Sequence, residues 1–284
     1  MCRFLLYAGQ EVVLADLIVR PKHSLIKQSI HSREREEPLN GDGFGVGWYD
    51  PRLSRDPCVF TSVSPAWSNR NLHRIADGIL SPLIFAHIRA ATPGLAVSEF
   101  NCHPFSYKHL MWMHNGHVES FNLIRREVRE KLPDSLYNMM QGTTDSEHAF
   151  ALFLSFLPED LTYEGPGPLQ EAMCKTIQEL NHLTKKAGIT QPSHYNFAVT
   201  DGDSIVVTRY TNQEEDEPES LYYSLGERFR CCGEECHVAP KKGKANAIVI
   251  ASERLTSENW QSVPKNHMIS IDASLNLTLE KIEL

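Results

Sequence analysis

The chain has 284 residues, 41% hydrophobic and 23% charged, a composition typical of an ordinary globular protein with a substantial packed core. A formal net charge of −8 excludes a basic footprint for nucleic acid and disfavours anionic membrane surfaces, so the expected partner is a small molecule or another protein. No stretch approaches the roughly 18 apolar residues of a membrane helix, and the apolar run at the N-terminus is too short for a secretory signal. We therefore expect a cytoplasmic protein that forms a single domain over residues 2–284.

The first half of the chain alternates between predicted strands and helices. The segment NGDGFGVGWYD, which starts at Asn40, alternates glycines with larger residues and predicts a strand with one bare face. Another backbone or a substrate could approach that face closely, with a bulge or tight sheet packing as the alternative. The remaining predictions here are strands at 3–8, 83–88 and 110–114, and helices at 11–19, 69–78 and 118–131.

The second half begins with helices and ends with strands. A helix capped by Asp145 or Ser146 should run to about residue 157. A longer helix over 169–187 carries one apolar stripe that we interpret as core. Strands are predicted at 195–200, 204–210, 221–225 and 247–251, with two more near the C-terminus and a hairpin turn at Asp201 and Gly202. This order indicates an α+β fold in which sheets pack face to face with helices outside.

Seven cysteines form an odd, scattered set, unlike the dense disulfide frameworks of small secreted domains. We therefore expect reduced thiols. The cluster Cys231, Cys232, Cys236 and His237 suggests zinc, but it lacks the second pair of ligands that a zinc finger supplies. No metal, nucleotide or flavin cofactor is predicted.

Cys2 is the most informative residue of the sequence. Its small side chain favours removal of the initiator methionine, which would leave a thiol beside a free α-amino group. That amine has a reference pKa of about 7.7 to 8.0, so it can act as a base near neutral pH, and the thiol is a strong nucleophile. A cysteine can also follow the start codon by chance, so the interpretation depends on the other residues that such a site would need.

Three further segments supply what an acyl-transfer site needs, namely oxyanion donors and groups that hold the substrate. Arg89 ends a predicted strand, and Thr92 lies in the turn behind it. Asn115 and Gly116 directly follow another strand, and Asp145 starts a helix. Taken singly, each has a structural explanation: a surface ion pair for Arg89, a common turn for Asn115 and Gly116, and a helix cap for Asp145.

Together and in this order, these segments resemble the class II glutamine amidotransferases, which are N-terminal-nucleophile hydrolases. The resemblance implies a four-layer αββα sandwich of two antiparallel sheets. It also implies a role for each matching residue: Cys2 as nucleophile with its α-amine as base, Asn115 and Gly116 as oxyanion hole, Arg89 for the glutamyl α-carboxylate, Asp145 for the α-ammonium, and Thr92 for substrate contact. A guanidinium suits a carboxylate and a carboxylate suits an ammonium, so the chemistry agrees.

Longer stretches, including MCRF, DGFGVGWY, NCHPF and ASERLTSENWQSVP, are similar to the compact γ-glutamyl hydrolase branch of this family. That branch includes the ergothioneine-pathway hydrolase, the amidotransferase subunit for fungal glutathione degradation, and YafJ-type proteins. The resemblance implies hydrolysis of a γ-glutamyl amide in a glutathione-like compound or related thiol peptide. Ala90 and Pro93 stand where synthase relatives carry tryptophan and histidine, which puts glutamine itself in doubt as the substrate. The alternatives are a glutaminase subunit that feeds a separate synthase through a protein partner, and a catalytically silent binding or scaffold protein.

Several other polar residues allow two interpretations. Cys102 and His103 are adjacent on the chain, so a loop-lining role is favoured over a thiol–imidazole pair. Ser252 and Glu253 could shape the pocket or pack in the core. His87 and His114 could orient the site, although we favour a structural role for both.

Overall fold

The computed structural model describes residues 2–34, 39–90, 97–232, 235–239, 245–257 and 259–284, without the side chains of residues 232, 235, 237 and 238. Two compact units are formed. The first comprises Met1–Met113 with Ser220–Val263, and the second comprises His114–Glu219 with Pro264–Leu284. Thr92 lies outside the described residues.

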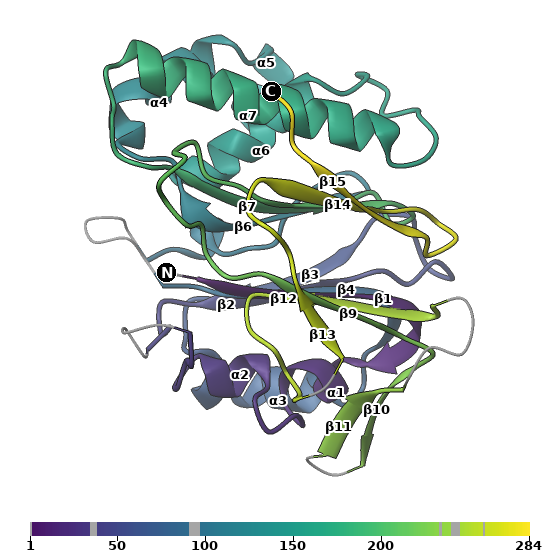
Figure 1. Cartoon of the computed structure of the whole chain (residues 1–284). Coiled ribbons are helices and arrows are strands. Elements are labelled where there is room, and N and C mark those ends of the chain that lie inside the picture. The colour runs from purple at the N-terminus through teal and green to yellow at the C-terminus, as the bar shows by residue number, and fades with distance from the viewer. Residues whose placement is uncertain (1, 35–38, 91–96, 233–234, 240–244, 258) are drawn as a thin grey trace. The chain divides into compact units, whose positions relative to one another are not determined.

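The first unit is built on a seven-stranded sheet in the order β13-β9-β12-β1-β4-β2-β3 (Figure 1). Every neighbouring pair in this sheet is antiparallel. The strands are β1 (Arg3–Val13), β2 (Phe44–Trp48), β3 (Cys58–Ser62), β4 (Leu80–Ile88), β9 (Tyr222–Gly226), β12 (Ala247–Ala251) and β13 (Trp260–Ser262). Strand β1 lies between β12 and β4, so the N-terminal segment is a central strand of its own sheet, as the buried apolar run at 3–8 predicts.

Helices α1 (Leu14–Ile18), α2 (Leu25–Gln28) and α3 (Arg70–Ala76) cover one face of this sheet (Figure 1). Their apolar side chains share a core with the inward residues of the strands, among them Leu5, Tyr7 and Val249. The helix predicted at 11–19 is therefore partly wrong. Its first residues extend β1 beyond an irregularity after Ala8, because Val12 and Val13 pair with the start of β4.

The glycines of β2 allow the close approach that the sequence predicts. A Cβ atom on Gly45 would lie 2.0 Å from the His103 carbonyl oxygen, and one on Gly47 would lie 2.3 Å from the Met111 sulfur. No real side chain tolerates such distances, so residues 103–111 can pack on the bare face of β2 only because glycine stands at both positions.

A hairpin of β10 (Phe229–Cys232) and β11 (Glu235–Val238) contradicts the expectation of reduced thiols throughout. The register pairs Cys231 with Cys236, and a disulfide joins them. Directly opposed strand residues bring their Cβ atoms within bonding range, which a count of cysteines cannot reveal. The side chains of Cys232 and His237, the other members of the supposed zinc cluster, lie outside the described residues. The four cysteines at 2, 58, 102 and 174 are free.

The second unit carries most of a six-stranded sheet in the order β15-β14-β8-β7-β6-β5. Its strands are β5 (Phe105–Tyr107), β6 (Leu110–His117), β7 (His194–Thr200), β8 (Ile205–Arg209), β14 (His267–Ile271) and β15 (Leu277–Lys281), and β6 crosses from the first range of residues into the second. The β5-β6, β7-β8, β8-β14 and β14-β15 pairs are antiparallel. The predicted hairpin at Asp201 and Gly202 is confirmed.

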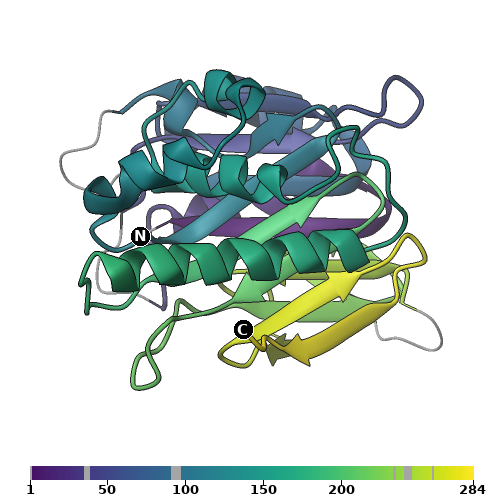
Figure 2. The ribbon, with the colours of Figure 1, turned by 90° about the horizontal axis from the view of Figure 1, so that it is seen from above.

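Helices α4 (Phe121–Glu130), α5 (Asp134–Met139), α6 (Asp145–Ser155) and α7 (Gly167–Lys186) lie on one side of this sheet (Figures 1 and 2). The apolar stripe predicted for the long helix is confirmed, since Leu169, Met173, Ile177 and Leu180 are all fully buried. The predicted cap of α6 is wrong by one residue. Thr144 caps the helix by accepting a hydrogen bond from the Glu147 amide, which leaves the Asp145 carboxylate for other partners.

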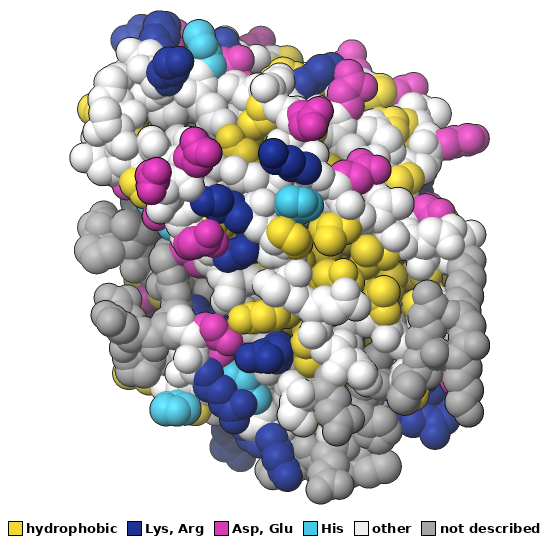
Figure 3. All heavy atoms as spheres, in the orientation of Figure 1, with side chains coloured by type: hydrophobic (Ala, Val, Ile, Leu, Met, Phe, Trp, Pro, Cys, Tyr) yellow, Lys and Arg dark blue, Asp and Glu magenta, His cyan; other side chains and the backbone are white. Residues whose placement is uncertain are grey.

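Three strands, not two, lie near the C-terminus, because the short β13 pairs at the edge of the first sheet. Short 3-10 turns occur at Ala66–Ser68 and Glu99–Asn101. Within the described residues, no helix has both the length and the apolar character required to cross a membrane. On the face shown in Figure 3, Lys and Arg side chains lie interspersed with Asp and Glu side chains.

Candidate active site

Strand pairing brings Cys2 beside residues that lie almost 90 positions later in the chain. The β1-β4 register joins Arg3 to Ile88, so Cys2 lies next to the end of β4. The Ala90 amide donates to the Cys2 sulfur over 3.5 Å, and the thiol donates to the Ala90 carbonyl oxygen over 3.6 Å. The first unit therefore unites two of the predicted segments, the N-terminal cysteine and the segment around Arg89.

The surroundings of Cys2 favour the protonated thiol. Burial raises the pKa of the Cys2 thiol, while the Ala90 amide and the positive charges of Arg89 and Arg3 oppose the increase without cancelling it. A thiol in this state is a poor nucleophile until a base removes its proton. Chemistry at Cys2 thus requires a base close to the sulfur.

Arg89 directly follows β4 and is held by backbone pairing with the glycine-containing segment before β2. Its amide donates to the Gly43 carbonyl oxygen over 2.9 Å, and its own carbonyl accepts from the Asp42 amide over 3.2 Å. Gly43 has a φ of +118°, and a Cβ there would lie 2.7 Å from the Cys102 sulfur. Arg89 is only 3% exposed, so a carboxylate that reached its guanidinium would leave water, and charge-assisted hydrogen bonds are strong in such surroundings.

Cys102 does not form a thiol–imidazole pair with the adjacent His103. Its sulfur donates to the carbonyl oxygens of Ser62 and Ser98, and burial raises its pKa to about 11. The His103 ring instead stacks on His87, with ring centroids 4.2 Å apart. These contacts support the expectation that the Cys102-His103 segment has no nucleophilic role.

A buried polar network anchors the strand that carries Cys2. Glu253 is 1% exposed, and its carboxylate accepts hydrogen bonds from Arg3 (2.6 Å), His23 (2.8 Å), the Arg33 amide (3.0 Å) and Ser32 (2.5 Å). Arg3 also donates to the Cys2 carbonyl oxygen over 3.0 Å. Glu253 lines a hollow of about 250 Å³ with His23, Arg33, Glu34, Arg254, Thr256 and Ser257. Ser252 supports the same strand, because its hydroxyl accepts from the Phe4 amide.

The Glu253 network predicts an acid-sensitive contribution to stability. Burial alone would raise the pKa of Glu253, but the hydrogen bonds from His23, Ser32 and Arg33 and the charge of Arg3 lower it from 4.5 to about 2. A depressed carboxyl pKa stabilises the fold fully above the unfolded pKa, and that stabilisation is lost as pH falls from about 4.5 towards 2. Glu253→Gln should therefore lower the free energy of unfolding by about 3 kcal/mol at pH 7, because it removes the carboxylate charge that these hydrogen bonds and the Arg3 charge stabilise.

Chemical denaturation between pH 2 and pH 7 measures this difference. Glu171→Gln is the matched control, since Glu171 is an exposed carboxylate on α7 in a surface ion pair with Lys175. It should leave the unfolding free energy nearly unchanged. Equal effects of the two substitutions would contradict the prediction.

In the second unit, Asn115 and Gly116 lie within the last residues of β6, not after the strand as predicted. The strand continues to His117, three residues beyond the expected end. Asn115 is 2% exposed. Gly116 has a φ of +148°, and a Cβ there would lie 2.1 Å from the His194 carbonyl oxygen, so only glycine fits.

Asp145 is tied to the same end of β6. One carboxylate oxygen accepts from the Val118 amide over 2.7 Å, and the other accepts from the Ser146 amide over 2.9 Å. The start of α6 and the segment that follows Gly116 are thereby held together. The second unit thus unites Asn115, Gly116 and Asp145, three residues that the sequence predicts to act together.

His114 has the structural role that the sequence favours. Burial lowers its pKa, although the Asp145 charge opposes the shift. Its Nε2 lies 2.9 Å from the His194 carbonyl oxygen, so the neutral ring donates there and accepts from the Ser146 hydroxyl at Nδ1, also over 2.9 Å. Both ring nitrogens are engaged, and the ring fixes β6 against α6 and β7.

Solved structures of known fold resemble the whole chain. A class II glutamine amidotransferase domain protein from Silicibacter pomeroyi matches with a TM-score of 0.68 and 25% identity, covering 98% of each chain. Glutamine phosphoribosylpyrophosphate amidotransferase from B. subtilis matches with a TM-score of 0.60 and 14% identity, covering 99% of this chain and 49% of that one. The predicted α+β class with two antiparallel sheets is confirmed, and it is the fold of the N-terminal-nucleophile hydrolases.

Within that class, the chain belongs to the class II glutamine amidotransferases, since this family matches residues 22–280. A probable glutamine amidotransferase, DUG3, from Saccharomyces cerevisiae is 43% identical over 95% of this chain and 82% of its own length. The γ-glutamyl-hercynylcysteine sulfoxide hydrolase of Mycolicibacterium smegmatis is 25% identical over 98% of this chain and 99% of its own length.

Proposed function

We propose that this chain hydrolyses the γ-glutamyl amide bond of a small γ-glutamyl compound through a thioester on Cys2, releasing glutamate. The observation that carries the proposal is the contact of the Cys2 sulfur with the Ala90 backbone, directly beside the buried Arg89. Membership of the amidotransferase family and the likeness to a γ-glutamyl-hercynylcysteine sulfoxide hydrolase support the same chemistry. The family match crosses both compact units, which supports our view that residues 2–284 act as one domain.

Each proposed role follows from charge and hydrogen-bonding capacity. Arg89 would hold the α-carboxylate of the glutamyl group, and Asp145 would accept hydrogen bonds from its α-ammonium. The Asn115 side-chain amide and the Gly116 amide would donate to the oxyanion. Thr92 would contact the substrate from the segment that follows Arg89.

The reaction begins once Met1 has been removed and the Cys2 amine is free. That amine takes the thiol proton, the sulfur bonds to the γ-carbonyl carbon, and the oxyanion forms. Collapse of this intermediate breaks the carbon–nitrogen bond, and the ammonium returns the proton to the departing amine. Water, deprotonated by the same amine, then attacks the thioester, which frees glutamate and restores the thiol. The raised pKa of the thiol makes such a base necessary.

A second candidate function is glutaminase activity that supplies ammonia to a separate synthase subunit. It is favoured by the family itself and by the name of the yeast relative, a probable glutamine amidotransferase. It would require a protein partner, whereas the lead proposal needs only the small substrate. We propose the cytosol as the site of action, because the nucleophile must stay reduced; the Cys231–Cys236 disulfide is the one observation against it.

Glutamate release from a panel of substrates tests the proposal. Glutathione and other γ-glutamyl peptides should be hydrolysed faster than glutamine, and the products should be glutamate and the free amine. Faster release from glutamine would support the glutaminase function. Absence of glutamate from every γ-glutamyl compound, with or without candidate partner proteins, would contradict both.

A further inference from the structure

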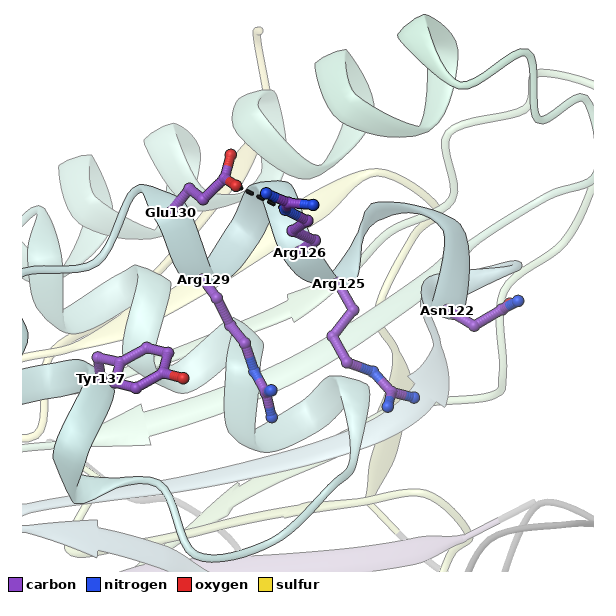
Figure 4. Close-up of a pocket in the computed structure, with 6 residues that line it drawn as sticks. All are labelled: Asn122, Arg125, Arg126, Arg129, Glu130 and Tyr137. Atoms are coloured by element: carbon purple, nitrogen blue, oxygen red, sulfur yellow. Dashed lines mark hydrogen bonds and ion pairs between the residues drawn. The ribbon is translucent and has the colours of Figure 1, made fainter.

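A hollow of about 450 Å³ lies on the second unit beside helices α4 and α5 (Figure 4). Three of its residues are arginines, although the whole chain carries a net charge of −8. It is lined by Asn122, Arg125, Arg126, Arg129, Glu130 and Tyr137. This concentration of positive charge is separate from the residues assigned to the γ-glutamyl reaction.

The three arginines differ in their partners. Arg126 forms an ion pair with Glu130 over 2.8 Å and is almost fully exposed. Arg125 and Arg129, one helical turn apart, are half-buried and extend side by side in the same direction (Figure 4). Among the residues that the structure describes, neither forms an ion pair with a carboxylate, so two adjacent positive charges remain available for a ligand.

Arg129 is held in place by a buried histidine. His148 is fully buried, and its Nδ1 lies 2.7 Å from the Thr144 carbonyl oxygen, to which it donates. Burial lowers the pKa of His148 to about 4, so the ring is neutral at pH 7 and its Nε2 accepts from Arg129 Nε over 2.9 Å. This contact orients the guanidinium without neutralising it, and its two terminal amino groups remain for another acceptor.

Within the described parts of the chain, Arg125 is positioned by packing rather than by a hydrogen bond. Its guanidinium carbon lies 5.6 Å above the centre of the Phe121 ring, a distance typical of a cation–π contact. On α6, the Glu147 carboxylate accepts from the backbone amides of Gln141 and Gly142. Both guanidinium groups are therefore ordered before any ligand binds, which lowers the entropic cost of binding.

We propose that this hollow is a binding site for a small phosphate-bearing molecule. Two adjacent guanidinium groups offer paired donors to a phosphate dianion with at least three terminal oxygens, whereas one guanidinium already suffices for a single carboxylate. Asn122 and Tyr137 add neutral hydrogen-bonding groups at the rim. The volume lies within the range of small-molecule sites, roughly 300–1,000 Å³. The proposal is independent of the proposed γ-glutamyl hydrolysis.

Calorimetric titration of the full chain with inorganic phosphate, at ionic strength held constant with chloride, tests the site. Arg125→Gln and Arg129→Gln should each raise the dissociation constant of phosphate about tenfold or more, since each removes a charge-assisted interaction. Arg126→Gln is the matched control on the same helix: it removes the same charge, but from a side chain already paired with Glu130, and should change the constant less than about twofold. Melting curves should show that all three variants remain folded.

Three results would overturn the proposal. The first is no phosphate binding above the chloride background. The second is equal weakening by all three substitutions, which would indicate a diffuse electrostatic effect rather than a site. The third is binding of a glutamate-rich peptide in preference to phosphate, which would assign the hollow to an acidic protein segment.

Discussion

Replacing Cys2 with alanine should lower glutamate release from a γ-glutamyl substrate by at least about 10⁴-fold, because no other group can form the acyl intermediate. The described part of the structure places the free Cys102 among the carbonyl oxygens of Ser62 and Ser98, with a pKa of about 11, so it cannot replace the lost nucleophile. Initial rates of glutamate release, measured on purified parent and variant at equal concentration, give the ratio directly.

Cys58→Ala is the matched control, since Cys58 is an exposed free thiol at the start of β3. It should release glutamate at the parental rate. Intact mass spectrometry of the parent should also show a chain that begins at Cys2, because retained Met1 would leave no amine on the nucleophile. Parental activity in the Cys2→Ala variant would exclude the thioester mechanism, whatever the substrate.

The sequence predicts best those elements whose pattern is set by local periodicity. The stripe of Leu169, Met173 and Ile177 repeats at helical spacing, and α7 follows it almost residue for residue. The prediction of a helix at 11–19 was partly wrong because Val12 and Val13 can adopt either helix or strand, and pairing with β4 decides between the two. Pairing partners far away in the chain override local preference.

The same distinction separates the predicted and the unpredicted parts of the site. Cys2, Arg89, Asn115 and Asp145 could be proposed as site residues because the short segments that carry them, taken together, resemble those of a known family. The network around Glu253 could not, since Arg3, His23 and Ser32 are joined to it across more than 200 residues. No spacing rule links such distant partners. Likewise, the five-residue separation of Cys231 and Cys236 does not reveal their disulfide until the hairpin register is known.

Asn115 is expected to act on turnover rather than on binding. If its amide donates to the oxyanion, Asn115→Ala should lower kcat by about 100-fold to 1,000-fold and change KM much less, because the oxyanion exists only after attack. Asn115→Asp keeps the size of this buried side chain but lacks the amide N–H and adds a negative charge that repels the oxyanion, so it should lose at least as much turnover. Steady-state kinetics with the preferred γ-glutamyl substrate separates kcat from KM.

Asn138→Ala, at an exposed position of α5, is the control for loss of an amide and should turn over at the parental rate. Melting curves distinguish a catalytic defect from unfolding, which is needed because Asn115 is buried. The decisive comparison is between the two Asn115 variants: the loss of a donor predicts a defect from both alanine and aspartate, whereas a cavity predicts a defect from alanine alone. Turnover by folded Asn115→Asp within tenfold of the parent would remove Asn115 from the oxyanion hole and leave Gly116 as its remaining proposed donor.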